Sequence, residues 1–88
     1  MSASADTLSN ADILERICGL IRPLNKKNVA LAPETTFADD LDLDSLTVMD
    51  LVAAIEDEFD IILPLNLLPD LETIQQVADT VEKILQGR

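Results

Sequence analysis

The residues best suited to chemistry lie between Asp39 and Leu51, in the stretch DDLDLDSLTVMDL, where five acids surround one serine. Asp40, Asp42 and Asp44 have the alternate spacing of carboxylates in a calcium-binding loop. The same stretch can instead begin a helix that presents the hydroxyl of Ser45. Two kinds of site are therefore compatible with it: a cation site, or a serine available for modification.

A calcium loop of the EF-hand type is excluded by two missing residues. A twelve-residue loop that begins at Asp40 needs glycine at its sixth position for the turn and glutamate at its twelfth for bidentate ligation. Those positions hold Ser45 and Leu51. We therefore predict no metal site, and interpret Asp44 as a helix cap, which accepts hydrogen bonds from the first helical turn.

Ser45 then falls in the first turn of the helix, where its hydroxyl would point toward solvent. A phosphate attached to it would meet free N–H groups and the positive end of the helix dipole. The position therefore suits a phosphodiester.

The same helix carries apolar residues outside its core stripe. Leu46, Met49 and Ala53 recur at i, i+3 and i+7, a spacing that places them along one side of a helix. Three acids fringe them: Asp50, Glu56 and Asp57. Apolar residues ringed by acids predict a protein-docking face.

The charge of the chain indicates the kind of partner that docks there. All six bases lie outside residues 28–82, an interval that holds fourteen of the 17 acids, and the net charge is -11. Such a field repels nucleic acid and anionic membranes and attracts proteins with basic patches. With 88 residues, 48% of them hydrophobic, we expect one folded domain over residues 1–88.

Residue types that are missing exclude further classes of function. The chain has no histidine and one cysteine, Cys18, which excludes histidine acid-base catalysis, a Cys/His zinc site and an internal disulfide. Cys18 lies among apolar residues and is interpreted as a small core residue. The N-terminal stretch is not typical of a signal peptide, and no segment is long enough to span a membrane, so we expect a cytoplasmic protein.

Helical periodicity appears three times, and no segment alternates long enough to build a sheet, so we predict an all-α fold. The first helix is expected over roughly residues 9–21, with Ser9 or Asp12 near its start and Pro23 after its end. Its predicted core residues are Leu14, Ile17, Cys18 and Ile21.

The second helix should begin at Asp44 or Ser45 and close at Asp60 and Pro64. The last helix opens with the capping box Thr73-Ile74-Gln75-Gln76 and ends at Gly87. Their predicted core stripes are Val48, Leu51, Val52, Ile55 and Phe59 in the second helix, and Ile74, Val77, Ala78, Val81, Ile84 and Leu85 in the last.

The connections are expected to be ordered. A long loop containing Pro33 joins the first two helices, and its apolar residues can pin it across the core: Val29, Leu31, Phe37, Leu41 and Leu43. The segment IILPLNLLPDL is interrupted by Pro64 and Pro69, so only a short helix fits, around Asn66 to Asp70.

The stretch DLDLDSLTVMDLVAAIEDEFDIILP resembles the acyl carrier protein family, whose hallmark is Asp-Ser-Leu at the start of the second helix of a four-helix bundle. Here the tripeptide is Asp44-Ser45-Leu46. The likeness covers roughly residues 8 to 86. Its other elements are Phe37, Asp40-Leu41, Glu58-Phe59-Asp60, Pro64 and Thr73-Ile74.

The resemblance implies a monomeric carrier rather than an enzyme. Ser45 would receive 4'-phosphopantetheine from coenzyme A through a phosphopantetheinyl transferase, and the terminal thiol would carry acyl groups as thioesters for fatty acid, specialised lipid or polyketide biosynthesis. Asp44 would help the transferase hold magnesium. The family's acyl-transferring and condensing enzymes would recognise the docking face: Leu46, Met49, Asp50, Ala53, Glu56 and Asp57.

Three departures from the family pattern qualify this expectation. Asp42 stands where glycine is usual, and Thr47 replaces a common acid. The third-helix region, acidic in well-known fatty-acid carriers, is apolar here from Leu65 to Leu71. We hypothesise a specialised carrier whose long or modified chain lodges beside this segment, although some of its leucines would simply cover the core.

Two alternatives stay open. An acidic helical interaction module with an unmodified Ser45 would have the same composition. An aminoacyl or peptidyl carrier would use the same arm, but the glycine-rich lead into the serine that is frequent in peptidyl carriers is absent.

Overall fold

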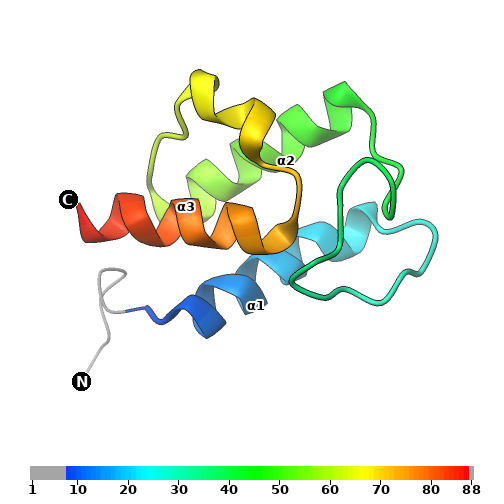
Figure 1. Cartoon of the computed structure of the whole chain (residues 1–88), viewed down its shortest axis with the longest axis horizontal. Helices are drawn as coiled ribbons and strands as arrows, with labels where there is room; N and C mark the ends of the chain where they lie inside the picture. The colour runs from blue at the N-terminus through cyan, green and yellow to red at the C-terminus, as the bar shows by residue number, and fades with distance from the viewer. Residues whose placement is uncertain (1–7, 88) are drawn as a thin grey trace.

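The computed structural model describes residues 8–87, apart from the side chain of Leu65, and within them the chain is helical. The elements are α1 (Asn10–Ile21), the 3-10 turn η2 (Arg22–Leu24), α2 (Ser45–Phe59), the 3-10 helix η3 (Leu65–Asp70) and α3 (Ile74–Gln86) (Figure 1). The described part of the chain holds no strand, only an isolated bridge between Thr36 and Thr73. The all-α prediction is confirmed.

Side-chain caps begin all three α-helices, at the predicted places. The N–H of Asp12 donates to Ser9 Oγ (3.1 Å), while the Asp12 carboxylate accepts from the Ser9 N–H, which completes a capping box. Thr73 and Gln76 form the second predicted capping box at the start of α3. Such caps satisfy N–H groups that have no partner inside the helix.

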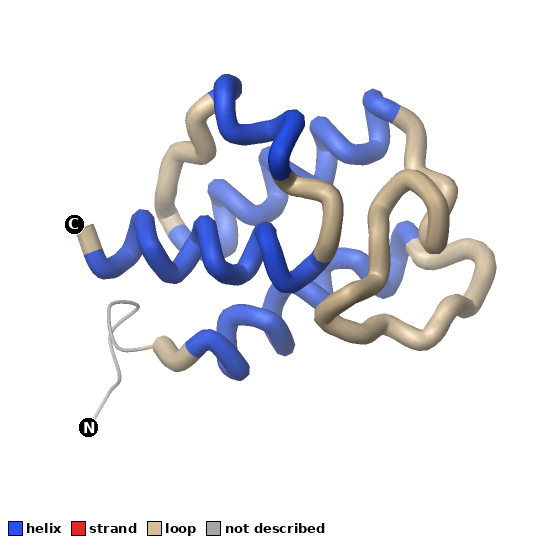
Figure 2. The backbone as a smooth tube through the Cα atoms, viewed as in Figure 1, coloured by secondary structure: helices blue, strands red, loops and turns tan. Residues whose placement is uncertain are grey.

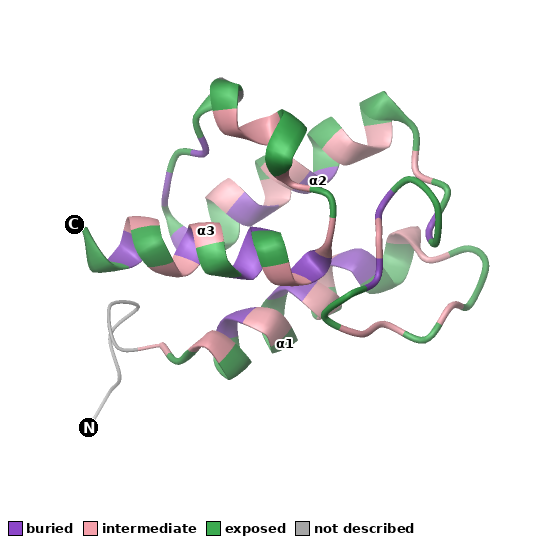
Figure 3. Ribbon diagram, viewed as in Figure 1, coloured by how far each residue is buried: buried purple, intermediate pink, exposed green. Residues whose placement is uncertain are grey.

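The core lies between α1, α2 and α3, and α1 packs most closely against α3 (Figure 3). The predicted stripes of α2 and α3 point inward, with Leu51, Ile55 and Phe59 buried on α2. The stripe predicted for α1 was partly wrong: Ile13 is buried, whereas Leu14 and Cys18 are only half-buried. The buried positions of α1 are spaced by four, a face directed mainly at one neighbouring helix.

A polar network joins the start of α1 to α3. Asn10 Nδ2 donates to Asp79 Oδ1 (3.1 Å) and to Glu82 Oε1 (2.9 Å), while its own Oδ1 accepts from Gln75 Nε2 (3.0 Å). One asparagine thus connects three side chains that lie far from it in sequence.

The long loop from residue 25 to residue 44 is ordered, as predicted (Figure 2). Phe37 and Leu41 are buried in the core. The Phe37 N–H donates to Glu72 O (3.1 Å), and the Ile74 N–H donates to Thr35 O (3.1 Å). The loop is therefore fastened to the start of α3 while it leads the chain back to α2.

The predicted short third helix is present as η3, a 3-10 helix of six residues that contains Pro69. Proline has no N–H for a helical hydrogen bond, and short 3-10 pieces are common where an α-helix cannot extend. Among the side chains described for η3 none is fully buried, and Leu67 and Leu68 are half-buried (Figure 3).

Candidate functional site

Ser45 is the first residue of α2 and is exposed. Asp44 caps this helix, and its Oδ1 accepts the N–H of Thr47 at 2.8 Å. Hydrogen bonds from the Thr47 side chain and backbone lower the pKa of Asp44, and the positive charge of Lys26 adds to the effect. An exposed hydroxyl therefore lies beside an ionised carboxylate at the positive end of a helix.

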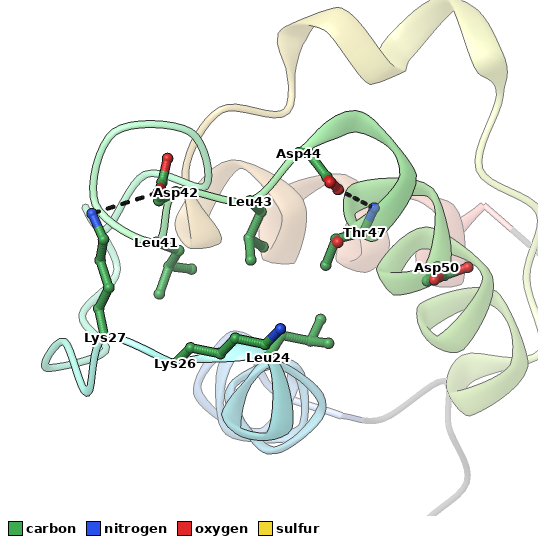
Figure 4. A pocket seen from close by; sticks show the side chains of 9 residues that line it. All are labelled: Leu24, Lys26, Lys27, Leu41, Asp42, Leu43, Asp44, Thr47 and Asp50. Carbon is green, nitrogen blue, oxygen red and sulfur yellow. Dashed lines mark hydrogen bonds and ion pairs between the residues drawn. The ribbon is translucent and has the colours of Figure 1, made fainter.

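A surface pocket of about 290 Å³ adjoins this helix start (Figure 4). Thr47 and Asp50 line it from α2, together with the cap residue Asp44, and Lys26 and Lys27 line it from the segment after η2. In Figure 4 the long side chain of Lys26 extends beneath Leu43 toward the start of α2. Two of the few cations of the chain are thus placed next to its most acidic stretch.

The backbone at Asp42 is left-handed, with a φ of 55°. This conformation favours glycine, although aspartate is among the residues that tolerate it. Lys27 Nζ lies 3.8 Å from Asp42 Oδ2. The departure from glycine therefore leaves the loop in a glycine-like conformation.

The predicted docking face is exposed along the outer side of α2. Leu46 is 78% exposed and Met49 46%, and the two large apolar side chains lie one turn apart on the same helix. The structure places Asp50, Ala53 and Asp57 at the surface of the same helix. These five residues are available to a partner.

Glu56, the sixth residue of that face, differs from the others. It is half-buried, and its Oε2 accepts the N–H of Leu63 at 2.8 Å. Sequence reasoning missed this contact because the chain reverses after Asp60, whose φ of 55° is left-handed. Glu56 therefore also has a structural partner.

Ile62 is an exposed apolar residue that sequence reasoning did not select. It is 79% exposed, while Ile61 and Leu63 on either side are buried. Inward and outward alternation is typical of extended backbone, and the pattern Ile61, Ile62, Leu63 after the helix end was the available signal.

The comparisons with known proteins agree with this geometry. Residues 11–81 match the family model described as "Phosphopantetheine attachment site". The chain is 34% identical over 73 residues to an acyl carrier protein of Thermobifida fusca, covering 83% of this chain and 85% of that protein. The chain belongs to the acyl carrier protein family.

Two further acyl carrier proteins match the chain at similar sequence identity. That of Thermosynechococcus vestitus is 32% identical over 75 residues, 84% of this chain and 93% of its own length. The mitochondrial acyl carrier protein of Saccharomyces cerevisiae is 32% identical over 79 residues, 84% of this chain and 63% of its own length. Membership makes this chain a carrier rather than an enzyme, with 4'-phosphopantetheine as its covalently attached prosthetic group.

In this carrier a narrow apolar cavity lies between α2 and η3. Its volume is about 20 Å³, enough for about one water molecule. Val48 and Val52 line it from α2, and Leu63, Leu68 and Leu71 line it from the segment around η3. Leu68 and Leu71, from the apolar segment singled out in the sequence, therefore form part of one wall of the cavity.

Neither Cys18 nor any group of metal-binding side chains in the described residues forms a second site. Burial raises the pKa of the Cys18 thiol, with partial opposition from Arg22, so the thiol is less reactive than an exposed one. Within residues 8–87, apart from the side chain of Leu65, no three or more acidic, histidine or cysteine side chains are grouped to hold a metal ion. No helix in that range is long and apolar enough to cross a membrane.

Proposed function

We propose that Ser45 is the attachment site of 4'-phosphopantetheine, and that the chain carries acyl intermediates as thioesters for fatty acid biosynthesis or for a related lipid or polyketide pathway. The observation that carries the assignment is the exposed hydroxyl at the first position of α2, next to its cap. It lies inside the range matched by the attachment-site family. Serine suits this role because its hydroxyl forms a stable phosphodiester, while the arm supplies the reactive thiol.

Asp44 has two roles in this proposal. It fixes the start of α2 through the Thr47 N–H, and so orients the serine that follows it. Its lowered pKa keeps it anionic, which suits a residue that helps a transferase hold magnesium beside the incoming phosphate. Magnesium prefers carboxylate oxygen together with substrate phosphate.

The partners would be a phosphopantetheinyl transferase and acyl-transferring or condensing enzymes with basic docking patches. They would dock on Leu46, Met49, Asp50, Ala53, Glu56 and Asp57. Acids steer a basic partner, and a small apolar centre supplies contact area. The resulting complexes would dissociate fast enough for one carrier to visit several enzymes.

In this proposal the chain is a single carrier domain over residues 1–88, a monomer that acts in the cytoplasm. The four-helix bundle of the family corresponds here to α1, α2, η3 and α3, with η3 as the short third helix. The shared core of α1, α2 and α3 supports the single-domain assignment.

A specialised cargo is the part of the proposal that depends on η3. A long or modified acyl chain would lodge between α2 and η3, where Val52, Leu68 and Leu71 meet. Because the present cavity is small, η3 must move outward to admit a chain. Long-chain acylation should then shift the amide resonances of residues 65 to 71; unchanged resonances there would exclude lodging at this edge.

The attachment is tested by intact mass. The protein is incubated with coenzyme A, magnesium and a broad-specificity phosphopantetheinyl transferase, alongside Ser45→Ala. We expect a gain of one arm in the parent and none in Ser45→Ala. Absence of any gain with several transferases would instead favour an unmodified acidic interaction module.

The cargo is identified by a second measurement, recovery of the thioester-bound group from the loaded protein. Recovery of a fatty acyl or polyketide thioester would agree with the proposal. Recovery of an aminoacyl thioester would identify a peptidyl-type carrier.

A further inference from the structure

We infer that Glu56 is a positioning residue that couples partner docking on α2 to the position of η3. The inference rests on the proposed docking face and adds a structural role for one of its residues. Its basis is that one carboxylate of α2 accepts the N–H of Leu63, a residue that lines the apolar cavity.

The first step is the location of Glu56 relative to Ser45. The two residues are eleven apart, close to three full turns, so they lie on the same side of α2 and roughly 16 Å apart along its axis. Met49 and Ala53 lie between them on that side. A partner that reaches Ser45 along this side of α2 therefore also reaches Glu56.

The second step is what the Glu56 carboxylate holds in place. Its Oε2 accepts the Leu63 N–H at 2.8 Å, a charge-assisted hydrogen bond that is stronger than one between neutral groups. Leu63 itself is buried and lines the cavity together with Leu68 and Leu71. The hydrogen bond thus fastens the chain just before η3.

The third step is how η3 is otherwise attached. Its backbone bonds are local, from the Leu67 N–H to Pro64 O and from the Leu71 N–H to Leu68 O. After η3 the chain is tied again, where the Phe37 N–H donates to Glu72 O. The segment is therefore tied to the rest of the chain before and after η3, and the acceptor before it, Glu56, belongs to α2.

These steps define a competition for one carboxylate. A lysine or arginine of a docked partner that pairs with Glu56 takes the acceptor from the Leu63 N–H. The residues before η3 then loosen, and the wall formed by Leu68 and Leu71 can move away from α2. Docking would in this way open the apolar edge at the moment when a partner is present.

The hydrogen bond is tested first in the free protein. Glu56→Ala should raise the exchange rate of the Leu63 amide by about tenfold or more, the effect of losing a hydrogen bond to a charged group. Glu56→Gln retains an acceptor oxygen and should restore much of the protection. Asp57→Ala removes a neighbouring exposed acid and is the matched control, with no change at Leu63. Equal protection in Glu56→Ala and the parent would overturn the inference.

The coupling is tested in the complex, with a purified phosphopantetheinyl transferase as the probe. Amide exchange of the Ser45→Ala protein is compared with and without saturating transferase. Exchange at Leu63 and Leu67 should rise about tenfold on binding, while the amides of Met49 and Asp50 shift because they are in the interface. Shifts at Met49 and Asp50 with Leu63 still protected would overturn the coupling, and so would the absence of any shift on α2.

The inference and the proposed function fail in different ways. Loss of Ser45 modification is seen by mass in the parent protein and does not affect Leu63 exchange in the free variants. Retained modification together with an unresponsive Leu63 amide would leave a carrier whose docking face and cavity are independent.

Discussion

The α1–α3 side of the molecule and the α2–η3 edge are built differently. On the first, Ile13, Ile17 and Ile74 are fully buried, and a polar network joins the start of α1 to α3. On the second, the described leucines of η3 are half-buried against a small cavity. The difference indicates that the α1–α3 side is the more tightly packed of the two, and that the edge proposed to receive cargo is the looser one.

The two sides differ for identifiable physical reasons. α1 and α3 present β-branched and aliphatic residues at helical spacing, so both bury a continuous face. η3 follows Pro64 and contains Pro69, which has no N–H for a helical hydrogen bond, and it forms a 3-10 helix. Local opening in proteins begins where few apolar contacts hold a segment, and η3 meets that description.

The largest expected effect is a difference in the free energy of unfolding between a substitution in the α1–α3 core and one in η3. Ile17→Ala should reduce the free energy of unfolding by roughly 2 to 5 kcal/mol, because it leaves a cavity in a closed core. Leu68→Ala should cost only about 1 kcal/mol, because a half-buried leucine loses part of its transfer free energy. Urea unfolding followed by circular dichroism measures both.

A milder substitution at the same position serves as a control in case Ile17→Ala does not fold. Ile17→Val removes one methylene group and should cost roughly 0.5 to 1.5 kcal/mol. If Leu68→Ala proved as costly as Ile17→Ala, the edge would be as tightly packed as the core, and the contrast between the two sides would be lost.

A smaller effect is expected at the polar network. Asn10→Ala removes the link between α1 and three side chains of α3, and should cost about 1 kcal/mol. The matched control is Asn66→Ala, an exposed asparagine on η3, with a change within about 0.5 kcal/mol. Thermal unfolding of both variants checks this. Equal shifts for the two asparagines would argue against a special role for the network.

The smallest effect concerns pH and the start of α2. The folded-state pKa of Asp44 lies below its ordinary value of 3.8, so its charge stabilises the fold above that value and the contribution is lost as pH falls through the lowered pKa. Asp44→Asn keeps a capping oxygen but has no charge. The difference in stability between Asp44→Asn and the parent should therefore shrink below about pH 4, as measured by urea unfolding across a pH series. A difference that stayed constant down to pH 2 would exclude the carboxylate as its source.

Much of the fold was predictable because its signals are local. Ser9, Asp44 and Thr73 cap helices in the structure as their side chains suggested, since a cap depends only on the next few residues. The exposure of Leu46 and Met49 follows from an equally local signal, because helical spacing alone puts them on one side of α2; their docking role stays a prediction. The assignment of Ser45 came from a resemblance and awaits its mass measurement.

The features that were missed depend on contacts distant in sequence. Glu58 was an unassigned acid of α2 until the fold brought Arg16 within 3.1 Å of it. The contact between Glu56 and Leu63 requires the reversal after Asp60. Ile13 was missed because two helical stripes one residue apart are nearly equal in hydrophobicity, and only the packing partner selects between them.

The arrangement of the helix ends has a practical consequence for experiments with this protein. Asn10, at the start of α1, contacts Glu82 near the end of α3. In Figure 1 the start of α1 and the end of α3 lie at the side of the molecule opposite the start of α2. A fluorophore or a surface linker attached at Leu8 or at Gly87 would therefore be remote from Ser45. The carrier can be immobilised on a sensor chip, or fused to a reporter, with its loading and docking end still facing the enzymes in solution.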